Sequence, residues 1–67
     1  MLNTSKIRGR MAQLGVSDSD VASALHLSRA VTVKKLNNIL LLNLDEAEKL
    51  ADLLRISDEA FGGYFFA

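Results

Sequence analysis

The sequence predicts an all-α fold, a compact bundle of five short helices in one domain that spans residues 1–67. Three observations predict it. The 67 residues leave room for one domain only. The chain contains no Pro and four Gly, with 49% hydrophobic residues, which argues against disorder. Its apolar residues recur at helical spacing behind Asn and Ser residues that are suited to cap helices.

The first two helices are indicated by their caps. Asn3 or Thr4 is suited to begin the first helix, and Gly15 to end it in the left-handed conformation. Spacing of i, i+4 and i+7 predicts an apolar face at Ile7, Met11 and Leu14. Ser17 is expected to begin a second helix of about two turns, with Asp20 at the acidic position of a capping box. Its apolar stripe is predicted at Val21, Ala22 and Leu25.

The third and fourth helices follow the same pattern. Ser28 is predicted to cap a third helix that ends near residues 37–38, since Asn tolerates left-handed geometry. Asn43, with Glu46 three residues later, predicts the start of a fourth helix. The broad apolar face of this helix is expected at Leu44, Ala47, Leu50, Ala51 and Leu54.

The end of the chain is aromatic. Ser57 is expected to cap a last short helix over residues 58–61, which the Gly62–Gly63 pair should end. The last seven residues contain all four aromatic side chains of the chain. Such a tail is expected either to cover the core or to contact a partner.

The composition argues against several classes of function. There is no Cys and one His, so we expect no disulfide, no metal site and no cofactor. The longest apolar run, residues 39–42, is far shorter than the roughly 20 residues that span a bilayer. Residues 1–4 show no signal-peptide pattern. We therefore expect a soluble, cytoplasmic protein that binds neither membrane nor small-molecule substrate, and at this length no enzyme.

The charge of the chain is unevenly distributed. Residues 1–43 carry six basic and two acidic side chains, a net charge of +4. Residues 44–67 carry two basic and six acidic side chains, a net charge of −4. The asymmetry predicts an anionic partner for the first part of the chain.

The second and third predicted helices are joined by a turn of three or four residues at residues 26–28. Ala22 is small enough to let the two helices cross closely, and Leu27 is placed to fill the corner between them. This spacing is typical of a helix-turn-helix, in which the second helix enters the major groove of DNA.

The segment Ser17–Ala30 resembles the helix-turn-helix of the phage-repressor family, also called Cro/CI-like or XRE. Residues 43–54 look like the fourth helix of that family, and residues 64–66 are similar to the aromatic tail of some members. The resemblance implies a lambda-repressor-like DNA-binding domain and a transcriptional regulator, a Cro/CI-like repressor of phage or prophage type. It implies a homodimer on palindromic double-stranded operator DNA, associated with the nucleoid when bound.

The chain departs from the family pattern at three positions of the second and third predicted helices and their turn. Asp18 stands where the family usually has Gln, and a carboxylate there is expected to repel the DNA backbone. His26 stands at the turn where Gly is usual. Thr32 stands where an apolar β-branched residue usually points inward. A rotation of the third helix by about one residue, which turns Val33 and Leu36 toward the core, would accommodate this change.

Seven residues of the third helix are predicted to contact DNA: Ser28, Arg29, Ala30, Val33, Lys34, Lys35 and Asn37. Arg29 is suited to bidentate bonds with a guanine edge, and Lys34 to a base or phosphate. Ala30 and Val33 are suited to contact thymine methyl groups. Ser28 and Asn37 are suited to bind phosphates. Lys35 is expected to add salt-sensitive attraction, as Lys6, Arg8 and Arg10 would if they face the DNA.

Specific binding by such domains generally pairs two copies on adjacent turns of DNA. The chain has no room for a separate dimerisation domain, so the surface must come from apolar residues at hand. Residues 39–42 occupy a connection that is usually polar in the family, and residues 64–66 are aromatic. The predicted homodimer interface comprises Ile39, Leu40, Leu41, Phe65 and Phe66.

Two alternatives remain open at this point. The same scaffold can serve as a protein-interaction module that has lost DNA binding, which the zero net charge permits. Residues 31–44 also permit a β-hairpin around residues 37–38, because Val-Thr-Val and the following apolar run favour strands. The hairpin would give an α+β domain without a third helix.

Overall fold

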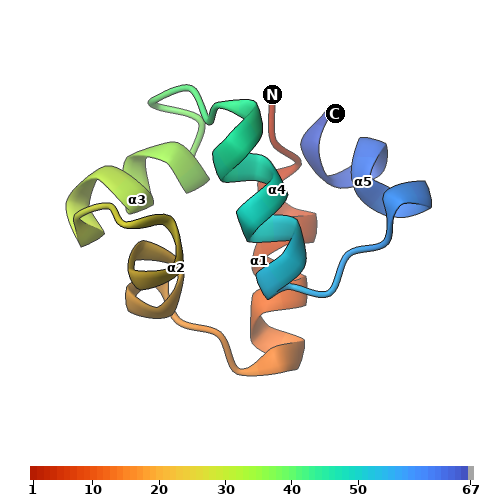
Figure 1. The fold of residues 1–67 in the computed structure, drawn as a ribbon, viewed down its shortest axis with the longest axis horizontal. Coiled ribbons are helices and arrows are strands. Elements are labelled where there is room, and N and C mark those ends of the chain that lie inside the picture. Colours follow the sequence, from red (N-terminus) through yellow and green to blue (C-terminus); the bar gives the residue numbers. More distant parts are fainter. Residues whose placement is uncertain (67) are drawn as a thin grey trace.

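A computed structural model describes residues 1–66, and five α-helices make up its regular structure (Figure 1). The helices are α1 (Thr4–Leu14), α2 (Asp18–Leu25), α3 (Arg29–Leu36), α4 (Leu44–Leu53) and α5 (Asp58–Phe65). No strand occurs within residues 1–66. The all-α prediction is therefore confirmed. The β-hairpin alternative is wrong, because residues 31–36 lie in α3 and residues 37–43 form no strand.

Each helix begins at a side chain that accepts a backbone N–H, as the sequence predicted. These N-caps are Asn3, Ser17, Ser28, Asn43 and Ser57. The capping box at the start of α2 is complete, with Asp20 at the position where Glu is usual. The Ser17 N–H donates to Asp20 Oδ2 at 2.9 Å, and the Asp20 N–H donates to Ser17 Oγ at 3.1 Å. The hydrogen bond from the Ser17 backbone N–H lowers the pKa of the Asp20 carboxyl, and a hydrogen bond with the Ser17 hydroxyl lowers it further.

The helices enclose one core, with α4 across the middle, α1 behind it, α2 and α3 on one flank and α5 on the other (Figure 1). The helix faces predicted from apolar spacing supply most of this core. Its fully buried side chains are Ile7, Val21, Thr32, Leu36, Leu50 and Leu54. Arg10 of α1 ties the far end of α4 to the bundle, since its Nε donates to the Leu54 carbonyl at 2.8 Å.

The last helix is longer than predicted, because α5 continues through Gly62–Gly63 to Phe65. Each helical Gly costs about 1 kcal/mol relative to Ala, and tertiary contacts outweigh this cost. The rings of Phe61 and Phe65 stack with centroids 4.4 Å apart, one helical turn from each other. Phe65 is 4% exposed within the core. The Asn3 N–H also donates to the Tyr64 carbonyl at 2.8 Å, which fixes α5 against the start of α1.

None of the helices formed by residues 1–66 combines the length and the apolar character that crossing a bilayer requires.

Candidate nucleic-acid interface

The pair formed by α2 and α3 presents one helix at the surface of the bundle. The connection between them is three residues long, His26 to Ser28, and α2 packs against both α3 and α4. Ala22 is buried, and its carbonyl accepts the Leu27 N–H at 3.0 Å. Leu27 packs against the core at the corner, as its position predicted. The orientation of α3 is thus fixed by buried contacts on both sides of the turn.

The rotation of α3 about its axis decides which side chains face outward. Thr32 and Leu36, one turn apart, are 0% and 1% exposed, so they define the inner face. The rotation of α3 that would turn both Val33 and Leu36 toward the core is not observed, because Leu36 is buried but Val33 remains half-buried at the edge. Thr32 is accommodated because its hydroxyl donates to the Ser28 carbonyl at 2.9 Å, which satisfies the one polar group that it buries.

The outer face of α3 carries six of the seven residues predicted to contact DNA. Ser28, Arg29, Ala30, Lys34 and Asn37 are exposed, and Val33 is half-buried. The spacing i, i+3, i+4 and i+7 aligns Ala30, Val33, Lys34 and Asn37 in one stripe. Arg29 lies at the exposed first turn. This face therefore combines a guanidinium, an ammonium, an amide and small apolar groups.

Lys35 does not belong to this outer face. Its Nζ donates to both carboxylate oxygens of Glu46 in α4, at 2.6 and 2.7 Å, and the two side chains are 15% and 10% exposed. Burial raises the pKa of the Glu46 carboxyl. The hydrogen bonds from Lys35 and from the Asn43 backbone N–H, with the Lys35 charge, outweigh burial and hold this pKa below its ordinary value. Lys35 thus joins α3 to α4, and we remove it from the predicted DNA contacts.

The other basic side chains of α1 are also engaged within the molecule. Arg8 forms an ion pair with Asp18, so the carboxylate that was expected to repel a DNA backbone is neutralised. Arg10 donates to carbonyls at the end of α4. Lys6 lies 4.7 Å above the centre of the Tyr64 ring. Within the described part of residues 1–43, Arg29 and Lys34 are the basic side chains that make no such contact.

The turn before α3 contains a strained residue that yields a first testable prediction. His26 has φ 56°, the left-handed region in which a Cβ costs about 1 kcal/mol. His26→Gly is expected to raise the free energy of unfolding by about 0.5–1 kcal/mol, less than the full strain because Gly also gains entropy when unfolded. Urea unfolding of this variant and of His26→Ala, which keeps the strain, measures the difference. Equal stability of the two variants would contradict the prediction.

The sequence pattern did not reveal the ion pairs that join different helices, Lys35 with Glu46 and Arg8 with Asp18. Glu46 was predicted only as part of a local cap, and Arg8 only as a solvated or DNA-facing charge. No spacing signal marks such pairs, because their partners are 10 or 11 residues away in the chain.

No protein-family model, curated protein or solved structure matches this chain. The interpretation of the α3 face therefore depends on its own residues and geometry.

Proposed function

We propose that the chain is a sequence-specific DNA-binding transcriptional regulator, a repressor of Cro/CI-like type that acts on operator DNA as a dimer in the cytoplasm. One observation carries the proposal. A short helix, α3, follows a three-residue turn, buries Thr32 and Leu36, and presents a continuous outer stripe of polar, basic and small residues. An exposed helix of this kind has the width and the chemistry to enter a major groove.

Each outward group has a partner on DNA. The Arg29 guanidinium, at the exposed start of α3, matches the two acceptors of a guanine edge. Lys34 is suited to a base or a phosphate, and Asn37 to a phosphate. Ala30 and Val33 are suited to thymine methyl groups. Ser28 already accepts the Val31 N–H, which leaves its hydroxyl proton for a phosphate oxygen.

The number of free cations limits the salt dependence that we expect. Each phosphate contact contributes about −0.9 to the slope of log affinity against log salt concentration. With Arg29 and Lys34 as the free basic groups of residues 1–43, the slope should be no steeper than about −2 per chain, or about −4 for a dimer. A steeper slope would mean that Lys6, Arg8 or Arg10 leaves its contact to bind DNA, or that the exposed Arg55 also contacts DNA.

The test is selection of tight binders from a pool of duplex DNA, followed by titration of the selected site over a salt series. Arg29→Ala is expected to weaken binding by 1–3 kcal/mol, about 5- to 150-fold, and to relax the preference at one guanine position. Lys34→Ala is expected to reduce the salt slope by about 0.9 per chain. Lys49→Ala is the matched control, because Lys49 lies on α4 and pairs with Asp45 at 3.1 Å.

Two results would overturn the proposal. The first is an absence of DNA binding at low salt by the folded protein. The second is equal loss of affinity in Arg29→Ala and in the Lys49→Ala control. Either result would favour the second candidate, a protein-interaction module on the same scaffold. The exposed apolar side chains Leu41 and Phe66 are the observation that favours it.

A further inference from the structure

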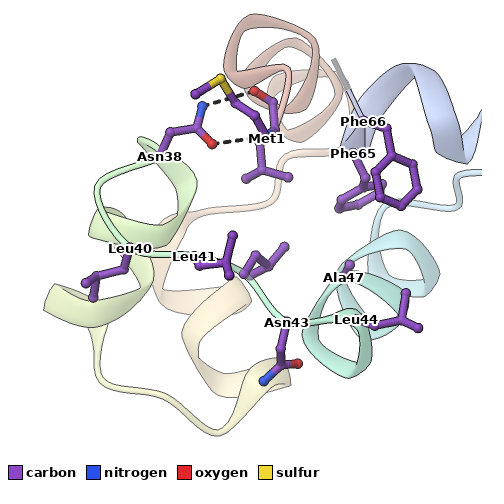
Figure 2. A pocket seen from close by; sticks show the side chains of 11 residues that line it. Met1, Asn38, Leu40, Leu41, Asn43, Leu44, Ala47, Phe65 and Phe66 are labelled. Atoms are coloured by element: carbon purple, nitrogen blue, oxygen red, sulfur yellow. Dashed lines mark hydrogen bonds between the residues drawn. The ribbon is translucent and has the colours of Figure 1, made fainter.

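Two hollows open on the side of α4 that lies toward α5. The first lies at the beginning of α4, has a volume of about 410 Å³ and is surrounded mainly by apolar side chains (Figure 2). The second, also of about 410 Å³, lies between α4 and the start of α5. Both are open because α4 packs against α2 and α5 against α1, so α4 and α5 make few close contacts with each other. We call the two hollows together the α4–α5 groove.

The two hollows are joined by Leu44 and by a cluster of phenylalanines. Leu44 lines both hollows and is 62% exposed. Phe61 lines the second hollow, and Phe65 and Phe66 line the first. The Phe61 ring stacks on Phe65 with centroids 4.4 Å apart and makes an edge contact with Phe66 at 5.8 Å. The groove is therefore one continuous surface with an apolar centre.

Exposed apolar side chains border the first hollow. Leu41 is 86% exposed and Phe66 69%. Soluble monomers rarely gather large exposed apolar side chains around a hollow, so this site is suited to receive an apolar side chain from another molecule. Phe65 is a correction to the predicted dimer interface, because its side chain is buried in the core. Ile39 is exposed but lines neither hollow.

The second hollow is bordered by carboxylates. Glu48 and Asp52 lie one and two helical turns after Leu44 on the same face of α4, and Asp58 lines the hollow from the start of α5. All three side chains are exposed, and none forms an ion pair within residues 1–66. Among the same residues, no basic side chain lines this hollow. The groove thus places three uncompensated negative charges beside an apolar site.

We propose that the α4–α5 groove binds a basic amphipathic helix of another protein. An apolar side chain of that helix enters the first hollow, and Lys or Arg side chains one to two turns further along it lie against the carboxylates of the second. The charge of the groove selects this occupant, because it attracts a cationic partner and repels the phosphates of nucleic acids and anionic lipids. From Leu44 to Asp52 α4 rises about 12 Å, so a partner helix of about three turns spans the groove.

This inference goes beyond the proposed function and does not rest on DNA binding. The acidic side chains of residues 44–67, which give that segment its net charge of −4, have no part in the contacts proposed for α3. The helices α3 and α5 lie on opposite flanks of α4 (Figure 1). A partner in the groove would therefore leave the outer face of α3 open.

Selection from a displayed library of helical peptides, each about 14 residues long, tests the proposal without DNA. The immobilised wild-type chain is the target, and the double variant Leu44→Ala/Glu48→Lys removes peptides that bind elsewhere. We expect the enriched peptides to carry Lys or Arg one to two turns from a Leu, Ile or Phe. The best of them should bind with a dissociation constant of roughly 1–50 µM.

Two pairs of variants locate the binding site of the best peptide by fluorescence anisotropy. Leu44→Ala should raise the dissociation constant about 5- to 20-fold, whereas Ile39→Ala, which truncates a similarly exposed side chain outside both hollows, should leave it unchanged. Glu48→Lys should raise it roughly 3- to 10-fold. Glu59→Lys changes the net charge equally but lies outside the groove, so its effect should stay below about twofold. Circular dichroism verifies that every variant is folded.

The proposal fails on any of three results, and none of them involves operator binding. No enrichment, or enriched peptides without net positive charge, would show that the groove does not recognise a basic helix. A peptide that binds Leu44→Ala as tightly as Ile39→Ala would use another surface. Self-association of the chain alone at about 200 µM that Leu44→Ala abolishes in sedimentation equilibrium would show that a second copy fills the groove.

Discussion

Replacement of Lys35 by methionine is expected to lower the free energy of unfolding by about 2–3 kcal/mol. The substitution leaves the Glu46 carboxylate, with its side chain 10% exposed, without the ammonium that neutralises it. A buried charge that loses its partner is strongly destabilising, and the slight exposure of this pair reduces the loss. Urea unfolding followed by circular dichroism measures the change.

Two comparisons isolate the ion pair from general effects of losing a lysine. Lys34→Met removes the neighbouring exposed lysine and is expected to change stability by less than about 0.5 kcal/mol. In the double variant Lys35→Met/Glu46→Gln, the amide still accepts the Asn43 N–H and closes the capping box without a buried charge. The double variant should regain most of the lost stability. A stable Lys35→Met single variant would show that the pair is not buried in solution.

The same pair sets part of the pH dependence of stability. The pKa of Glu46 is lowered in the folded chain, so its contribution is complete above the unfolded pKa of about 4.3 and is lost as the pH falls through the folded value. In Lys35→Met, burial and the charge of Asp45 raise this pKa without opposition from Lys35. Acid unfolding of the variant should therefore show a shallower loss of stability. The pKa of Asp20 is also lowered in the folded chain, so part of the dependence of stability on pH remains in both the wild type and Lys35→Met.

The helix starts could be predicted because their determinants are local. A cap such as Ser17 and its partner Asp20 are three residues apart, within the span that a sequence pattern covers. The apolar faces were likewise predictable from helical spacing, and Val21, Ala22 and Leu25 are buried as expected. Local physical chemistry thus determines most of the secondary structure and the inward faces of this chain.

The errors arose where contacts between distant segments outweigh local preference. The glycine pair was expected to end α5, but the burial of Phe65 and the bond between Asn3 and Tyr64 carry the helix past it. The sequence left open whether Thr32 faces the core, and a hydrogen bond within α3 lets it take this apolar position. Lys35 was assigned to DNA because its sequence position does not reveal Glu46.

The outward residues of α3 could largely be predicted because they do not depend on contacts between distant segments. Outward positions on a helix need no partner within the chain, so they follow from the identity of the inward ones. Once the inner face of α3 is fixed at Thr32 and Leu36, the outer stripe from Ala30 to Asn37 follows from 3.6 residues per turn. The exception, Lys35, lies between the two faces, where a long side chain can turn either way.

Asn38 was predicted only to help end α3, and Asn38→Ala is expected to lower the free energy of unfolding by about 2 kcal/mol. Its Oδ1 accepts the Leu2 N–H at 3.0 Å, and its Nδ2 donates to the Leu2 carbonyl at 3.0 Å (Figure 2). Its Nδ2 also donates to Thr4 Oγ1 at 3.1 Å. These bonds hold the buried Leu2 against the end of α3. The variant loses them and also places Ala at φ 60°.

Two further variants separate the loss of hydrogen bonds from the strain of the left-handed backbone. Asn38→Gly loses the same hydrogen bonds but adopts the left-handed conformation without strain, so it should be less destabilised than Asn38→Ala by up to about 1 kcal/mol. Asn37→Ala is the matched control, because Asn37 is exposed and has φ −96°, and it should change stability by less than about 0.5 kcal/mol. If Asn38→Gly is as stable as the wild type, the bonds to Leu2 and Thr4 contribute nothing. If Asn37→Ala and Asn38→Ala lose equally, the loss reflects fraying of α3 rather than a tie to the first residues of the chain.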